Sequence, residues 1–357
     1  MKINFFLPKK KKIVVLGITP IYLDYLKYQA HYIKPLKNEI NLYFFIIALI
    51  RKISSPNNLK FYEYYILSYI EYLDPKFLLS STDYNLFFLN LKKFFPDKKL
   101  VFFQCHFRNR LMLKDYINIK QKFKIDYFFC WGRLFINNYY KKFIDSNFIV
   151  SGSIKNNFIK INNKSNKKDL IFISQYRLNK DKKKEFFYFY KKLINSALSF
   201  CKSNRIKLKI LGSKQICEHA RKEIDFYNKI INPIYKKNFL YIHNKGNLFS
   251  YKYLSNYKYV LTSTSSLGYE AASKGMRVAF IFRYIYKYEK PWLFNKTGKI
   301  WTNKIDNKNI SKVLRNIYRI KKNEILDIKK RYITPLVSYD PQNKNYIKKN
   351  LKNILND

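Results

Sequence analysis

The stretch Ser263-Thr264-Ser265-Ser266-Leu267-Gly268-Tyr269-Glu270-Ala271-Ala272-Ser273-Lys274-Gly275 decides how the second half of this chain folds. Apolar runs frame it, residues 259–262 before it and 278–282 after it, and both are typical of buried parallel strands. The space between them fits a loop and about two helical turns, with Gly275 as the C-terminal stop. The stretch therefore predicts a strand, a hydroxyl-rich loop, a helix and a second strand.

This arrangement predicts a binding site for a nucleotide. A helix that opens on hydroxyl residues presents backbone N–H groups and O–H donors to one point, which suits a phosphate. Glu270 would repel a phosphate beside it and is better suited to accept hydrogen bonds from the two hydroxyls of a ribose. An ordinary α/β unit is the alternative, in which Ser266 caps the helix, Glu270 complements its dipole and Gly275 ends it. The residues expected at the donor site here are Ser263, Thr264, Ser265, Ser266, Leu267, Gly268 and Glu270.

Length and composition limit the class of protein. A chain of 357 residues exceeds the usual size of one core, so two domains are expected, and 47% hydrophobic residues exclude a disordered chain. The longest apolar run, residues 42–50, falls short of the ~20 residues that cross a bilayer, and the start of the chain lacks the pattern of a secretory signal. Four cysteines without metal-like spacing fit reduced thiols. We expect a cytoplasmic protein.

The net charge of +48 is carried mainly by lysine: the chain has 59 Lys and 12 Arg. Lysine lacks the planar fork that suits bidentate recognition of phosphates and guanines, and the excess resembles a codon bias toward AT-rich codons. No nucleic-acid partner is therefore expected. The lysine run 9–12 is a candidate for attraction to acidic lipids at the inner face of the cell membrane, or else a solvated lead-in to the first strand.

Strands and helix-length segments alternate along the chain. The predicted strands are residues 13–17, 77–80, 100–103, 127–130 and 148–150 in the first half, and 170–173, 208–211 and 239–242 in the second half, before the two that frame the opening stretch. The predicted helices are residues 63–73, 86–95, 134–143, 182–201 and 220–227. This alternation predicts the α/β class, with two Rossmann-like doubly wound parallel sheets that face a central cleft.

The polar stretch 160–169 is nearly free of apolar residues and is the best candidate for a linker. We therefore expect an acceptor-side domain at residues 1–159, a nucleotide-binding domain at 170–335 and a helical tail at 336–357.

Polar residues that directly follow strands are the remaining candidates for the site. Ser174, Gln175 and Arg177 follow a strand of the second half, where Arg177 would neutralise a diphosphate leaving group or else be an ordinary surface residue. His243 would touch a phosphate or base, with an ordinary loop histidine as the alternative.

In the first half, Asp83 and His106 are the candidate proton acceptors, and capping of the next helix is the alternative for Asp83. Three neighbours are expected on the acceptor side, namely Thr82, Gln104 and Arg108.

Six short pieces in order, between about residues 75 and 285, resemble the bacterial surface-carbohydrate (O-antigen) biosynthesis proteins, which are related to glycosyltransferases of the GT-B architecture. The pieces are residues 81–85, 104–108, 126–132, 151–157, 171–177 and 265–271. The chain departs from the family pattern at Tyr84, where relatives have Asn, and at Cys105 and His106, where they have Asn and Gly. Both departures lie on the acceptor side and bear on the choice of base.

The resemblance implies a metal-independent sugar transferase of surface-polysaccharide synthesis with no resident cofactor. A nucleotide-sugar would be the co-substrate, and a glycan or lipid-linked molecule the acceptor. Ser265, Ser266 and Gly268 would then meet the phosphates, Glu270 the ribose and Arg177 the diphosphate. The expected reaction is attack of an acceptor hydroxyl, deprotonated by Asp83 or His106, on the anomeric carbon. A nucleotide-sugar epimerase and a basic nucleic-acid-binding protein are the alternatives.

Overall fold

The computed structural model describes residues 2–17, 23, 26, 29–33, 39–55, 59–83, 85–107, 122–158, 168–177, 184–215, 218–246, 248–283, 297–339 and 343–356. The chain divides into two compact units. Unit 1 comprises residues 1–105, 116–154 and 345–357, and unit 2 comprises residues 106–115 and 155–344. Residues 160–167 of the predicted linker lie outside the described residues.

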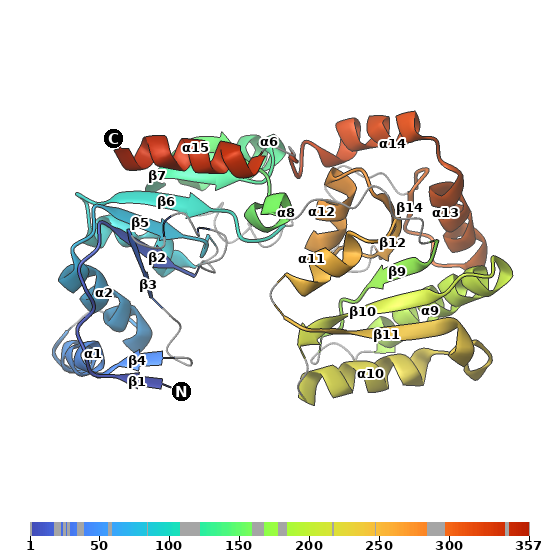
Figure 1. Ribbon diagram of the computed structural model, residues 1–357, viewed down its shortest axis with the longest axis horizontal. Helices are drawn as coiled ribbons and strands as arrows, with labels where there is room; N and C mark the ends of the chain where they lie inside the picture. The colour runs from blue at the N-terminus through green and yellow to red at the C-terminus, as the bar shows by residue number, and fades with distance from the viewer. Residues whose placement is uncertain are drawn as a thin grey trace. The chain divides into compact units, whose positions relative to one another are not determined.

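Unit 1 contains a parallel sheet of six strands in the spatial order β3-β2-β5-β6-β7-β8 (Figure 1). The strands are β2 (Ile13–Leu16), β3 (Ala30–Ile33), β5 (Phe77–Ser80), β6 (Lys99–Phe103), β7 (Phe123–Cys130) and β8 (Ile144–Val150). Its interior strands β2 and β5 are buried along their whole length, as expected for their mainly apolar sequences.

Two of the helices predicted in unit 1 are divided into shorter helical pieces in the structure. The helices of unit 1 are α1 (Leu42–Ser54), α2 (Phe61–Leu73), α3 (Leu86–Leu89), α4 (Leu91–Phe94), α6 (Arg133–Phe135), a π-helical turn Ile136–Tyr140, α7 (Lys141–Phe143) and α15 (Asn343–Asn356). The single helix predicted at 86–95 is interrupted at Asn90, whose side-chain amide donates to the Leu86 carbonyl at 2.9 Å. A short parallel pair, β1 (Lys2–Asn4) and β4 (Glu39–Asn41), lies next to α1 and α2 (Figure 1).

Unit 2 contains a second parallel sheet, in the order β11-β10-β9-β12-β13-β14. The strands are β9 (Leu170–Ile173), β10 (Leu208–Gln215), β11 (Phe239–Asn244), β12 (Tyr259–Thr262), β13 (Arg277–Ile281) and β14 (Trp301–Thr302). The helices are α8 (Ile154–Phe158), α9 (Lys184–Ser203), α10 (Glu218–Ile230), α11 (Phe249–Leu254), α12 (Ser266–Ser273), α13 (Asn307–Arg319) and α14 (Lys322–Ile328), with a 3-10 turn Pro233–Asn238 and a π-helical turn Lys329–Ile333. The expectation of two doubly wound parallel sheets is confirmed.

None of the helices in the described ranges combines the length and the hydrophobicity that a membrane crossing requires.

Candidate functional site

The strand order of unit 2 places a switch point between β9 and β12. From β9 the chain moves outward through β10 to β11 and then returns to the other side of β9 to form β12. Counted within the unit, the spatial order is 3-2-1-4-5-6, which is the order of dinucleotide-binding folds. Loops that leave neighbouring parallel strands in opposite directions open a crevice at their carboxyl ends, where ligands of such sheets bind. The predicted donor residues follow these two strands.

Gln175 joins the two loops at this switch point. Its side-chain carbonyl accepts a hydrogen bond from the Thr264 N–H at 2.8 Å, and its amide donates to the Thr264 hydroxyl at 3.3 Å. Arg177 follows two residues later with an exposed side chain. The structure thus joins Gln175 and Thr264, two of the residues that the sequence assigns to the donor, and Arg177 lies two residues further along the same loop.

The first turn of α12 retains amide groups for a ligand. Ser265 stands at the N-cap with no side-chain capping bond, and its carbonyl accepts the N–H groups of Gly268 and Tyr269 at 2.9 and 3.3 Å. Among the described residues, nothing accepts a hydrogen bond from the N–H groups of Ser266 and Leu267. Such amides at a helix N-terminus are suited to an anion. The alternative in which Ser266 is the capping residue is wrong, because the helix begins at Ser266 itself.

Glycine is required at positions 268 and 275 for two different structural reasons. A Cβ on Gly268 would lie 2.5 Å from the Thr262 Cγ2 atom, so only glycine lets α12 pack this close to the end of β12. Gly275 has φ +82° directly after the C-cap residue Lys274, which confirms it as the stop of the helix.

Residues 106–115 belong to unit 2, and the beginning of this segment lies on α12. The Phe107 N–H donates to the Ser266 hydroxyl at 3.3 Å, and its ring stacks on Tyr269 with centroids 4.1 Å apart and planes 4° apart. His106 precedes Phe107 and is exposed. This contact brings the backbone of a candidate base close to the predicted phosphate site, which sequence reasoning did not foresee.

Glu270 is 1% exposed and points into unit 2. Its Oε2 atom accepts a hydrogen bond from the Tyr251 hydroxyl at 2.9 Å, and its backbone carbonyl accepts one from Asn156 at 3.1 Å. The space beside Tyr251, Leu267 and Lys274 is about 10 Å³, enough for about one water molecule and too small for a pentose. A ribose hydroxyl would reach this carboxylate only after local rearrangement, and the ribose role stays a prediction.

Glu223 of α10 organises the ends of β9 and β10 and was not found from the sequence. It is fully buried and accepts hydrogen bonds from the Ser174 hydroxyl and from the N–H and hydroxyl of Ser213, the latter two at 3.0 and 3.1 Å. Ser174 also bonds the Tyr227 hydroxyl at 2.7 Å, and burial raises the pKa of that phenol. Ser174 therefore anchors the loop that carries Gln175. The signal in the sequence was an acid in the apolar stripe of an amphipathic helix.

Two further predicted donor residues differ from the expectation in their strand position or their burial. His243 is part of β11, whereas the sequence placed it after the strand, and β11 is the edge strand two places from β9. Ser263 is 2% exposed at the end of β12.

In unit 1 Asp83 is a buried carboxylate at the ends of β5 and β6. Its Oδ1 atom accepts the Cys105 N–H at 3.2 Å, and its Oδ2 atom accepts the Tyr140 hydroxyl at 3.2 Å. The alternative that Asp83 caps the next helix is wrong, since Asn85 is the N-cap of α3 and its side chain accepts from the Phe87 N–H. Burial and the Asp83 charge together raise the pKa of the Cys130 thiol. Through these hydrogen bonds, the Asp83 carboxylate holds the loop that follows β6 in position.

Of the remaining acceptor-side candidates, Gln104 and Thr82 form hydrogen bonds with other residues of unit 1. The Gln104 side chain accepts from the Trp131 N–H at 2.9 Å, and its backbone carbonyl accepts from the Trp131 indole N–H at 2.8 Å, so this residue fastens β6 to β7. Thr82 is half-buried and its hydroxyl bonds that of Ser80 at 2.5 Å. Arg108 lies outside the described residues.

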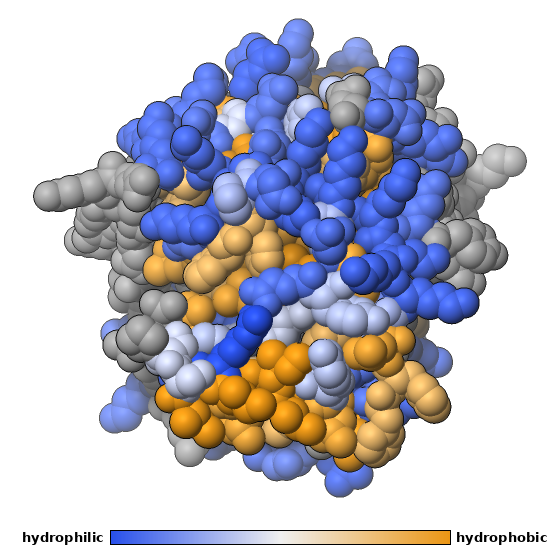
Figure 2. Space-filling model, turned by 90° about the vertical axis from the view of Figure 1, so that its left-hand side faces the viewer, coloured by the Kyte–Doolittle hydropathy of each residue, from blue (hydrophilic) through white to orange (hydrophobic). Residues whose placement is uncertain are grey.

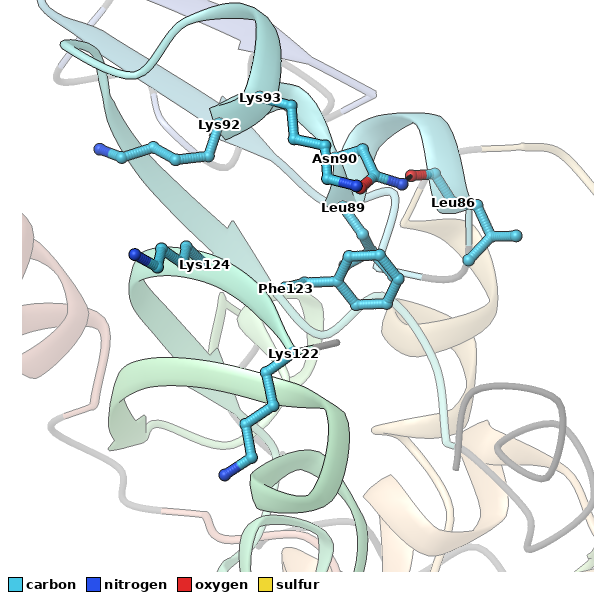
Figure 3. Close-up of a pocket in the computed structure, with 8 residues that line it drawn as sticks. All are labelled: Leu86, Leu89, Asn90, Lys92, Lys93, Lys122, Phe123 and Lys124. Atoms are coloured by element: carbon cyan, nitrogen blue, oxygen red, sulfur yellow. Dashed lines mark hydrogen bonds between the residues drawn. The ribbon is translucent and has the colours of Figure 1, made fainter. Parts of the chain in front are cut away.

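Two larger cavities lie near the amino ends of strands, on the side of each sheet opposite to the candidate site. In unit 1 a cavity of about 310 Å³ lies where β7 begins at Phe123, between lysine side chains and the α3–α4 segment (Figure 3). In unit 2 a cavity of about 530 Å³ lies where β12 and β13 begin, at Tyr259 and Arg277. Because parallel strands share one direction, both cavities are remote from the carboxyl ends that carry the candidate site. No cluster of three His, Cys, Asp or Glu residues able to hold a metal ion occurs within the described ranges.

Comparison with known proteins assigns the chain to a family. The model of a family described as "putative O-antigen biosynthesis protein" matches residues 107–354, more than half of the chain. The chain belongs to this O-antigen biosynthesis family. No curated protein matches it. The resemblance found in the sequence is thereby confirmed.

Solved structures similar to this member of the O-antigen biosynthesis family show its fold. The UDP-GlcNAc 2-epimerase of Methanocaldococcus jannaschii in complex with UDP-GlcNAc and UDP has a TM-score of 0.57 and 13% identity, over 99% of this chain and 100% of its own. The epimerase of Neisseria meningitidis bound to UDP-GlcNAc has a TM-score of 0.52 and 15% identity, over 99% and 100%. The wall teichoic acid polymerase TagF soaked with CDPG has a TM-score of 0.55 and 12% identity, over 98% and 90%. The fold is GT-B.

Proposed function

We propose that this protein transfers a sugar from a nucleotide-activated donor to a glycan or lipid-linked acceptor in the synthesis of a surface polysaccharide, without a metal ion. The observation that carries the proposal is the switch point of unit 2, where Gln175 ties the loop after β9 to the hydroxyl-rich loop before α12. The O-antigen biosynthesis family and the nucleotide-sugars bound by proteins of the same fold support it.

The donor's phosphates would lie at the N-terminus of α12. The amides of Ser266 and Leu267 would supply donors there, and the exposed Arg177 would offset negative charge on the leaving nucleotide. These groups stabilise the charge that develops as the bond between the anomeric carbon and the phosphate oxygen breaks, so they favour the transition state more than the ground state.

His106 is the base in this proposal. The acceptor hydroxyl attacks the anomeric carbon, its proton passes to the His106 imidazole, and the nucleotide departs with the electrons of the broken bond. The His106 side chain is exposed, as a group that must reach a substrate has to be, whereas Asp83 is 3% exposed and holds the backbone of Cys105 next to it. Asp83 is then a positioning residue.

Epimerisation of a nucleotide-sugar is the second candidate, favoured by the two epimerases among the similar structures. It needs no acceptor, and it exchanges a carbon-bound proton with solvent. Incubation of a nucleotide-sugar with the protein in heavy water, followed by NMR, therefore separates the two functions. Deuterium in the sugar without an acceptor would establish epimerisation and overturn the transferase.

The test of nucleotide binding is a thermal-shift panel of UDP, GDP, CMP and CDP. A nucleotide present at about one hundred times its dissociation constant adds ~2.7 kcal/mol to the free energy of unfolding. Arg177→Ala is expected to weaken the binding about tenfold or more. Arg221→Ala, an exposed arginine on α10, is the matched control and should bind normally.

The assignment of the base has its own test. His106→Ala should abolish sugar transfer while it leaves nucleotide affinity unchanged. If none of the four nucleotides raises the unfolding temperature, or if Arg177→Ala binds as tightly as the wild type, the donor site is not at this switch point.

A further inference from the structure

Unit 1 exposes a concentrated apolar surface. Sixteen large apolar side chains are well exposed in the described ranges, and nine of them lie on two neighbouring segments. They form what we call the apolar face, made of Ile3, Phe5, Phe6, Leu7, Tyr43, Ile46, Leu49, Ile50 and Ile53. Phe6 and Ile53 are the most exposed, at 83% and 79%. Clustering of this kind on one face marks an interaction surface, whereas scattered exposed residues do not.

Helix α1 is apolar on both of its sides. Phe44 and Ala48 are fully buried, and Phe44 packs on Tyr69 of α2 with ring centroids 3.9 Å apart. The opposite side carries Ile46, Ile50 and Ile53, spaced so that they share one stripe of the helix. A surface helix normally presents polar residues there, so this side is adapted to an apolar environment.

The exposed phenylalanines are held in a defined conformation. β1 pairs with β4, and the Asn41 side chain at the start of α1 donates to the Phe6 carbonyl at 2.8 Å. The Phe6 N–H in turn donates to the Asn4 side chain at 3.0 Å. Residues 3–7 therefore continue the apolar side of α1 as one fixed surface.

Exposed lysines lie on the same segments as the apolar face, or directly after them in the sequence. Lys2, Lys9, Lys10, Lys12 and Lys52 are exposed. The Lys10 ammonium lies 5.8 Å from the centroid of the Tyr72 ring, and that ring contacts Tyr43 and Phe44 of α1. The nearby acid Glu71 pairs with Arg51 at 2.5 Å. The surroundings of the apolar face are thus basic.

Figure 2 looks at this end of unit 1. A continuous orange area runs along the lower edge of the face, where Figure 1 places α1 and β1, and blue hydrophilic side chains lie above it. Apolar side chains bordered by positive charge are the combination that binds the surface of an anionic bilayer, because the apolar groups enter the acyl boundary while lysines contact lipid phosphates.

We propose that the apolar face docks the protein on an anionic lipid bilayer, with α1 lying in the plane of the interface. A helix of 13 residues is about 20 Å long, which is too short to cross a bilayer and long enough to lie in its surface. A second copy of the chain is a poorer occupant, because symmetric pairing would bring two sets of lysines together. The proposal does not depend on the transferase function.

Vesicle sedimentation with the full chain tests the proposal, in the absence of any nucleotide or acceptor. Wild-type protein should bind vesicles of mixed phosphatidylcholine and phosphatidylglycerol at least ~10-fold more tightly than pure phosphatidylcholine vesicles. The double variant Ile46→Ser with Ile50→Ser should lose at least ~10-fold of the affinity for the mixed vesicles. Replacement of Lys9, Lys10 and Lys12 by Gln should bring the affinity for mixed vesicles close to that for neutral ones.

The matched control replaces Ile234 and Leu240 by Ser, two exposed apolar residues of unit 2 at 62% and 49% exposure, and should bind like the wild type. Circular dichroism and the unfolding temperature show that each variant is folded. The proposal is overturned if the wild type ignores the mixed vesicles, or if the α1 variant binds them as well as the control does. It is also overturned if sedimentation velocity without lipid shows a dimer that the α1 variant dissociates, since a second copy then covers the face.

Discussion

The buried Glu270 and the half-buried Tyr251 form a hydrogen-bonded pair whose two members can be tested separately. Removal of the carboxylate in Glu270→Ala leaves the Tyr251 hydroxyl without its acceptor, so we expect the free energy of unfolding to fall by about 1–3 kcal/mol. If the carboxylate also binds the ribose, nucleotide affinity falls about tenfold or more as well. Tyr251→Phe removes the same hydrogen bond and keeps the carboxylate, so it should lower stability while nucleotide affinity stays at the wild-type level.

The comparison of these two variants by urea unfolding and nucleotide titration decides the role of Glu270. Equal loss of stability with unchanged nucleotide affinity in both variants would make Glu270 a purely structural residue. The chain would then need another group to hold the ribose.

Lys274, at the end of α12, gives a prediction for pH. Burial lowers the pKa of its ammonium group to about 8, against the opposing effect of the Glu270 carboxylate. A lysine in the unfolded chain titrates near ~10.4, so between about pH 8 and 10 the unfolded chain binds more protons than the folded one, and stability contributed by this site rises with pH. Below pH 8 the charged form is present in both states and its burial costs free energy.

Lys274→Met is therefore expected to be more stable than the wild type by about 1–2 kcal/mol at pH 7, and the difference should shrink as the pH rises toward 10. Urea unfolding at a series of pH values measures it. Lys258→Met, an exposed lysine nearby, serves as the control and should show a small difference at every pH. If the difference in free energy of unfolding between Lys274→Met and the wild type stays constant from pH 7 to 10, the lowered pKa of Lys274 is contradicted.

At the scale of elements, α10 holds the ends of β9 and β10 through one side chain. Glu223→Ala would leave the Ser174 hydroxyl and the Ser213 N–H without their buried acceptor, so we expect a loss of about 2–4 kcal/mol in the free energy of unfolding. Nucleotide binding should weaken too, because Gln175 follows Ser174 directly. Glu218→Ala on the same helix is the control: its pair with Lys222 is well exposed, so its removal should leave the free energy of unfolding close to the wild-type value.

Chemical denaturation of the Glu223 and Glu218 variants gives these values directly. Similar losses in the two variants would show that the network around Glu223 contributes little to the stability of the sheet.

The strands were predictable from the sequence and several helices were not. β5, β9 and β12 have the predicted bounds, because each is a short, mainly apolar run, buried along all or nearly all of its length, that suits an interior parallel strand. The helix predicted at 134–143 contains instead the π-helical turn Ile136–Tyr140, and Tyr140 reaches Asp83, which is distant in sequence. β7 begins at Phe123 and α1 was not recognised as a helix, since an apolar run shows no helical period when both sides are apolar.

The candidate site, like the fold, has features that the sequence predicts and features that it does not. Loop residues after β9 and β12 were foreseen because topology alone brings the carboxyl ends of parallel strands together. The direction in which a side chain points was not foreseeable. Asp83, Gln104, Ser174 and Glu270 all turn inward, each toward a partner far away in sequence: Tyr140, Trp131, Glu223 and Tyr251.

At the scale of the whole molecule, the net charge of +48 opposes folding. Positive charges repel one another more strongly in the compact state than in the extended chain, and added salt screens that repulsion with a Debye length of ~10 Å at 0.1 M. With 23 acids for 71 basic residues, one-to-one pairing cannot neutralise most of the positive charge.

We therefore expect the free energy of unfolding to rise by about 1–3 kcal/mol when sodium chloride is raised from low to physiological concentration, with an unchanged dependence on urea. Urea, which is uncharged, is the denaturant for this measurement, because guanidinium chloride would itself screen the charges. Potassium chloride should have the same effect as sodium chloride if screening is the cause. A stability that falls with either salt would show that ion pairs such as Lys209 with Asp169, at 2.9 Å, outweigh the repulsion among the lysines.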